Sequence, residues 1–150
     1  MRAFKFNLET ILTLRKHEED SVKYEMAGVN RRFERERGMM ERLKKGLLEG
    51  LSSVTSRGGE SRSEEWLDAG RYIESHNKSI QSQEKKLKVL EAEMEGMRVR
   101  LREAARRRRL LELLREKKLK EYRKESAKAE QDVQDEAGGR AGTLKQEAEQ

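Results

Sequence analysis

The chain has 150 residues, of which 43% are charged and 33% hydrophobic, and its formal net charge is +6 at pH 7. It contains no proline and no cysteine, and 5% of its residues are aromatic. Such a composition cannot fill a globular core and is typical of long helices and coiled coils. The lack of proline permits unkinked helices, and the lack of cysteine excludes disulfides and thiolate metal sites.

The sequence also lacks the patterns of an active site. No glycine-rich loop ends in Gly-Lys-Ser/Thr, so nucleotide binding by that device is excluded. His17 and His76 lie far apart, and neither has a second metal ligand three or four residues away. The carboxylates are scattered among basic residues, as on a solvated helix face. We therefore predict no catalytic residue, no metal, no cofactor and no enzyme activity.

The N-terminal segment does not resemble a secretion signal, because Lys5 and Glu9 interrupt it before an apolar stretch develops. No segment approaches the roughly 20 apolar residues that span a bilayer. The densest apolar run is Leu110-Leu-Glu-Leu-Leu114. These features predict a soluble, cytoplasmic protein.

Apolar residues in the first third of the chain recur at steps of three and four, which is the heptad pattern of a coiled coil. This pattern predicts one helix over residues 4–54. Its seam consists of Leu8, Leu12, Val22, Met26, Val29, Phe33, Met40, Leu43, Leu47 and Val54.

A serine-rich stretch with a Gly58-Gly59 pair follows, and Ser61 to Glu64 reads as a capping box. We therefore predict a turn over 55–62 and a second helix over 63–136. The glycine-bearing residues 137–150 are expected to form a flexible tail. The second seam consists of Trp66, Ala69, Ile73, His76, Ile80, Gln83, Leu87, Leu90, Met94, Met97 and Leu101.

Folding the chain back at Gly58-Gly59 sets apolar residues opposite apolar residues. Leu43 then faces Ile73, and Phe4, Phe6 and Leu8 face the run from Leu110 to Leu114. The predicted fold is all-α, a long antiparallel two-helix coiled-coil hairpin, as a single domain over residues 1–136. We expect it to be a monomer. Glycines inside both helices predict modest stability, although drift at exposed positions explains them equally well.

The strongest electrostatic feature is the run Arg106, Arg107, Arg108 and Arg109 within a basic segment from Arg98 to Lys124. On a helix these four side chains point around the axis as a positive collar. Nucleic-acid binding, an ordinary solvated surface and protein docking are all open readings. Docking is favoured, because no aromatic residue interleaves with the run and no zipper heptads follow it.

Aromatic side chains are the other candidates for partner binding, since they dominate interface energetics. Trp66 and Phe33 fall on the seams and are expected in the core. Tyr72 falls beside the second seam. With His76, Ser79 and Gln83 it traces a stripe at helical spacing that a partner could bind.

Two clusters of residues resemble the flagellar export protein FliJ family. The first is Phe4-Lys-Phe6-x-Leu8-x-x-Ile11-Leu12-x-Leu14-Arg15-x-x-Glu18-Glu19. The second is Trp66-x5-Tyr72-Ile73-x6-Ile80-x-x-Gln83-x3-Leu87. The sequence departs from the family pattern at His76, where an aliphatic residue is expected, and in its acidic, glycine-bearing tail.

The resemblance implies a stalk-like antiparallel coiled coil of the type III export apparatus. Its implied partners are the hexameric flagellar export ATPase, the cytoplasmic region of the export gate protein and substrate-specific export chaperones. No nucleic acid is expected, and contact with the inner membrane at the flagellar base is expected only through partners. The stripe of Tyr72, His76, Ser79 and Gln83 would bind the gate. Phe4, Phe6 and the collar would bind the ATPase ring.

Other classes of function remain open from the sequence. A generic coiled-coil scaffold would self-associate in parallel, and a basic nucleic-acid-binding helix would bind duplex DNA with a steep salt dependence. The residues also do not separate a flagellar from a virulence-type secretion stalk.

Overall fold

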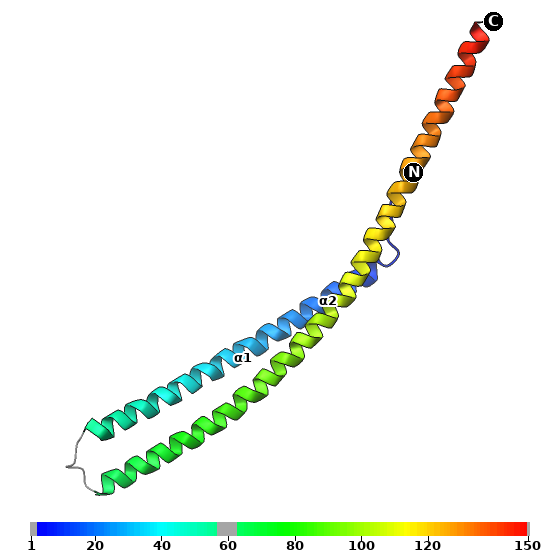
Figure 1. Cartoon of the computed structure of the whole chain (residues 1–150). Coiled ribbons are helices and arrows are strands. Elements are labelled where there is room, and N and C mark those ends of the chain that lie inside the picture. The colour runs from blue at the N-terminus through cyan, green and yellow to red at the C-terminus, as the bar shows by residue number, and fades with distance from the viewer. Residues whose placement is uncertain (1–2, 57–62, 150) are drawn as a thin grey trace. The chain divides into compact units, whose positions relative to one another are not determined.

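The computed structural model describes residues 3–56 and 63–149, and it contains two helices (Figure 1). Helix α1 spans Glu9–Ser56 and helix α2 spans Ser63–Ala148. The described residues contain no strand. The predicted all-α helical hairpin is therefore confirmed. The Gly58-Gly59 turn and the first residues of the predicted capping box lie outside the described residues.

The helices contribute to two compact units. Residues 19–103 form one unit, called here the hairpin unit, in which α1 and α2 lie side by side and antiparallel (Figure 1). Residues 1–18 and 104–150 form the other, called here the terminal unit. Each unit therefore pairs a segment of α1 with a segment of α2.

Helix α1 begins at Glu9 rather than at the predicted residue 4. The amide of Glu9 donates to the carbonyl of Phe6 at 3.1 Å, which closes a turn before the first helical residues. The carboxylate of Glu9 in the first turn also suits the positive end of the helix dipole. Residues 3–8 are therefore non-helical and free to pack against α2.

Helix α2 begins at Ser63, as predicted, but continues past residue 136 to Ala148. The stretch from Ala127 onward is rich in alanine, glutamate, glutamine and lysine, which are strong helix formers. Their favourable helix propensity outweighs the unfavourable propensity of Gly138, Gly139 and Gly142, on which the predicted helix end was based. A separate C-terminal tail stays a prediction.

The two predicted seams are confirmed by burial at every position except one. Leu12, Val22, Val29, Met40, Gln83 and Leu90 are buried, with Ala104 beyond the second seam, and the other seam residues except Trp66 are half-buried. Trp66 is the exception, because 53% of its surface is exposed. It lies in the first turn of α2, at the end of the second seam. The core is a single narrow seam, as expected for two helices.

The contact of Tyr72 with Gly46 lies close to the predicted pairing, whereas other contacts between the helices lie further toward the C-terminus of α2. In the hairpin unit, Arg32 pairs with Glu93 at 2.7 Å. In the terminal unit, the ring of Phe4 contacts that of Tyr122 at a tilt of 51°, with centroids 5.6 Å apart, whereas Leu110 and Leu113 are exposed. Non-helical residues advance by up to about 3.3 Å each, compared with 1.5 Å in a helix, so Phe4 reaches further along α2 than a helical residue would.

Candidate partner-binding surfaces

The Tyr72–His76 pair lies on α2 in the hairpin unit, and both rings are directed toward α1. Their centroids lie 4.4 Å apart, and the hydroxyl of Tyr72 donates to the backbone carbonyl of Gly46 at 3.4 Å. Tyr72 nevertheless keeps 43% of its surface exposed. The pair therefore presents one ring partly to solvent while it is anchored on the neighbouring helix.

The rest of the predicted stripe divides between surface and core. Ser79 is exposed, whereas only 5% of the surface of Gln83 is exposed. The amide of Gln83 donates to the backbone carbonyl of Glu36 at 2.8 Å and also bonds its carboxylate. Gln83 thus crosslinks the two helices, and the exposed part of the stripe consists of Tyr72 and Ser79. Partner binding by these residues stays a prediction.

The N-terminal aromatic residues lie in the terminal unit against α2. Phe4 and Phe6 are half-buried and line a groove together with Leu114, Lys118 and Tyr122. None of the four collar arginines lines this groove. At 1.5 Å per residue, Tyr122 lies about 20 Å along α2 from Arg108. The structure therefore does not bring Phe4 and Phe6 next to the collar, although both belong to the same unit.

The arginine collar is not displayed equally on all sides of α2. Arg106, Arg107 and Arg109 are exposed, but Arg108 is half-buried and pairs with Glu112 at 2.7 Å. Arg109 shares Glu112 at 3.4 Å and also reaches Glu116 at 3.3 Å. Arg108 and Arg109 thus share Glu112 as a carboxylate partner about one turn further along the helix.

The hydrogen bond from Arg108, together with the charges of Arg108 and Arg109, lowers the pKa of Glu112 below its ordinary value. A depressed carboxyl pKa stabilises the folded state above the unfolded-state pKa, and this contribution disappears as pH falls through the folded-state pKa. The contribution is small, because the pair is accessible to solvent.

We therefore expect Arg108→Gln to raise the pKa of Glu112 toward its ordinary value. Carboxyl carbon NMR titration of the wild type and the variant measures this directly. Lys118→Gln is the matched control, because Lys118 pairs with Glu121 instead. An unchanged Glu112 titration in Arg108→Gln would contradict the assignment.

The family model described as flagellar FliJ protein matches residues 4–147, nearly the whole chain. The chain belongs to this family. Comparisons with curated proteins and with solved structures gave no match. Membership of the FliJ family implies a component of the flagellar export apparatus, and the family is a non-catalytic one.

Among the described residues, no group of three or more histidines and carboxylates is arranged to hold a metal ion. No described helix is long and apolar enough to cross a membrane.

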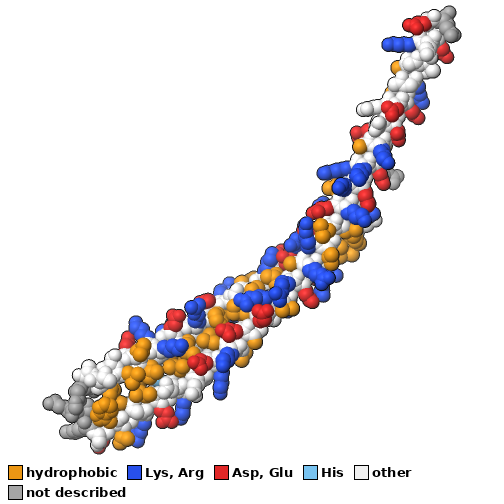
Figure 2. All heavy atoms as spheres, viewed as in Figure 1, with side chains coloured by type: hydrophobic (Ala, Val, Ile, Leu, Met, Phe, Trp, Pro, Cys, Tyr) orange, Lys and Arg blue, Asp and Glu red, His pale blue; other side chains and the backbone are white. Residues whose placement is uncertain are grey.

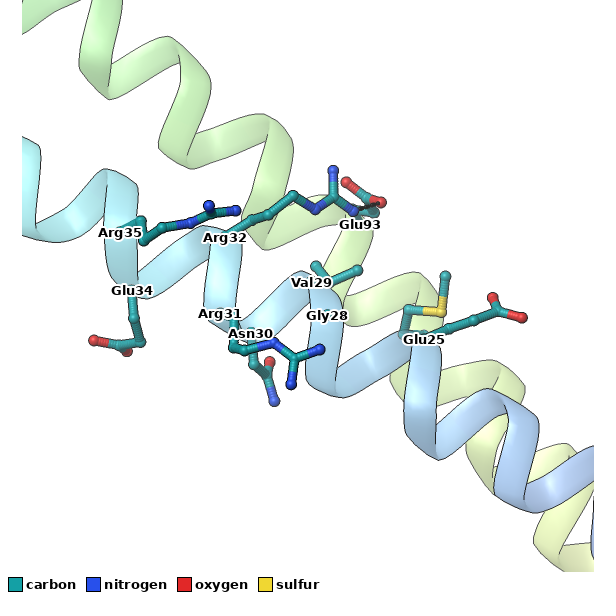
Figure 3. A pocket seen from close by; sticks show the side chains of 10 residues that line it. Glu25, Gly28, Val29, Asn30, Arg31, Arg32, Glu34, Arg35 and Glu93 are labelled. Atoms are coloured by element: carbon teal, nitrogen blue, oxygen red, sulfur yellow. Dashed lines mark hydrogen bonds and ion pairs between the residues drawn. The ribbon is translucent and has the colours of Figure 1, made fainter.

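A groove between the helices of the hairpin unit opens beside Gly28 (Figure 3). Its carboxylates already have cationic partners, since Glu93 pairs with Arg32 and Glu25 pairs with Arg100 at 2.8 Å. Figure 3 shows Asn30 and Arg31 pointing away from α2. The groove therefore results from the missing side chain at Gly28, and its charged residues are not arranged as a reactive site.

Sequence reasoning missed an exposed apolar surface in the hairpin unit. Figure 2 shows hydrophobic side chains gathered at the end of this unit where α1 ends and α2 begins. Those with large exposed areas are Leu48, Leu51, Trp66 and Leu67. Leu48 and Leu67 lie beside the seams in the sequence. Apolar residues outside the heptad seams near the predicted turn could therefore have indicated this surface. In a FliJ family chain this surface is a further candidate for protein contact.

Proposed function

We propose that this FliJ family chain is a non-enzymatic central-stalk-like coiled coil of the flagellar export apparatus. In this role it binds the hexameric export ATPase, couples the ring to the cytoplasmic region of the export gate protein and escorts or recycles export chaperones. It is a monomer that reaches the inner membrane only through these partners.

One observation carries the proposal: the two candidate surfaces belong to different units. The collar and the N-terminal aromatic residues lie in the terminal unit, and Tyr72 with its neighbours lies in the hairpin unit. A chain that links two partners needs separate surfaces, so that one partner does not exclude the other.

The terminal unit offers both kinds of contact that a ring interior would use. Its basic residues suit acidic side chains lining the ring, and such contacts mainly tune encounter rate and salt dependence. Its exposed apolar side chains add contact area: Ile11, Leu14, Leu110, Leu113 and Leu114. A ring of six identical subunits can hold one asymmetric coiled coil only along its axis, where different faces meet different subunits.

The hairpin unit supports the gate contact through the partly exposed Tyr72 ring. A rigid aromatic side chain anchored on a helix pair is the kind of residue that dominates protein interfaces. The chaperone role rests on family membership, and the exposed surface of Leu48, Leu51, Trp66 and Leu67 is the candidate for it.

The test combines the purified chain with the export ATPase of the same organism. Native mass spectrometry should show one chain per six ATPase subunits, and ATP hydrolysis should rise when the chain is added. Parallel self-association without ATPase binding would favour the scaffold reading instead. Tight, steeply salt-dependent binding to duplex DNA would favour the nucleic-acid reading.

A further inference from the structure

Two glycines of α1 lie directly beneath the Tyr72–His76 pair. Gly46 and Gly50 are four residues apart, so they share one face of the helix. A Cβ added at Gly50 would lie 2.4 Å from Cε1 of Tyr72, and one at Gly46 would lie 3.3 Å from Nε2 of His76. The Tyr72 ring therefore occupies the space that a side chain at Gly50 would need, and the His76 ring lies in tight contact with the position of a side chain at Gly46.

The other helical glycines of the hairpin unit do not behave in this way. A Cβ at Gly28, Gly38, Gly70 or Gly96 would meet nothing within 4 Å. Glycine is a poor helix former, and an alanine at those open positions would favour the helix. Gly46 and Gly50 thus differ from these glycines because the rings of His76 and Tyr72 lie against them.

We propose that Gly46 and Gly50 are positioning residues, which form a seat on α1 that receives the rings of Tyr72 and His76. The seat lets Tyr72 approach closely enough for its hydroxyl to reach the carbonyl of Gly46. With the hydroxyl directed inward, the ring of Tyr72 is what a partner meets. This last step rests on the proposed function, in which that partner is the export gate protein.

The two glycines contribute unequally. A distance of 2.4 Å is shorter than real Cβ contacts, so an alanine at Gly50 requires the Tyr72 ring or the backbone around Gly50 to shift. The ring is the far end of a side chain with two rotatable bonds, so it can swing outward without separating the helices. At 3.3 Å, an alanine at Gly46 requires His76 to shift by only a few tenths of an ångström.

The test compares Gly50→Ala with Gly38→Ala, because both change a glycine inside α1 and only Gly50 has a ring against it. Gly38→Ala should raise the melting temperature and leave Tyr72 in place. Gly50→Ala should abolish the NMR cross-peaks between the Tyr72 ring and α1 and give no such rise. It should also weaken binding to the purified cytoplasmic region of the gate protein several-fold.

A double variant distinguishes a clash with the Tyr72 ring from a general loss of folding. If Gly50→Ala loses helicity, Gly50→Ala combined with Tyr72→Ala should restore it, because the clash is then absent. Failure of the double variant to restore helicity overturns the seat, and so do unchanged Tyr72 cross-peaks in folded Gly50→Ala. Lost cross-peaks with unchanged gate affinity would support the seat and overturn the gate contact of the proposed function.

Discussion

Replacing Leu12 by alanine should destabilise the terminal unit more than any other single truncation of an apolar side chain in the described chain. Only 1% of the surface of Leu12 is exposed, which makes it the largest fully buried side chain of the described residues. Leucine-to-alanine changes at such sites cost about 2–5 kcal/mol, from lost burial and from the cavity left behind. A two-helix seam has few other buried residues to compensate.

Hydrogen exchange of α1 residues near Leu12 is the appropriate measurement, since it reports the opening of one unit separately from the other. Leu14→Ala is the matched control, because Leu14 lies two residues away and 54% of its surface is exposed. The control should leave exchange almost unchanged. Equal effects of the two variants would show that Leu12 does not anchor the unit.

The heptad pattern predicted the helices and their buried faces well, because side-chain direction along a helix is a local property. Val22, Val29 and Met40 repeat at seam spacing, and all three are buried. The positions where helices begin and end were predicted less well. Phe4 and Phe6 fall inside the predicted first helix, but the contact of Phe4 with Tyr122 depends on a residue more than a hundred positions away.

The candidate site was only partly predictable for a related reason. Gln83 satisfied both the seam and the stripe, and its burial against Glu36 decided between them. Gly46 and Gly50 could not be distinguished in sequence from glycines at open positions. Their meaning depends on which α2 residues lie opposite, and pairing between helices is set by the turn and by contacts along the whole unit.

The seat and Gln83 provide two polar crosslinks between the helices of the hairpin unit. Tyr72 reaches the backbone of Gly46, and Gln83 reaches the backbone of Glu36. Both contacts use a side chain of α2 and a carbonyl of α1. Such bonds fix the register of two helices whose apolar seam alone would tolerate sliding by a heptad.

Reversing the charge of Arg106 and Arg107 to glutamate should abolish ATPase stimulation at low salt if the collar meets the ring. Both side chains are exposed, and leaving Arg108 and Arg109 unchanged keeps their ion pairs with Glu112. A reversed pair would face acidic ring residues with like charge, which slows encounter and weakens the complex. The effect should shrink as added salt screens it.

The matched control reverses Lys85 and Lys86, which are exposed residues of α2 in the hairpin unit and carry the same charge. Both variants change the net charge equally, so a general electrostatic effect would reduce stimulation in both. A specific collar contact would reduce it in the Arg106 and Arg107 variant alone, with helicity by circular dichroism unchanged. Full stimulation of the ATPase by the Arg106 and Arg107 variant would show that the collar does not contact the ring. The exposed apolar residues of the terminal unit, Leu110 and Leu113 among them, would then be the remaining candidates, because apolar contact is insensitive to charge reversal nearby.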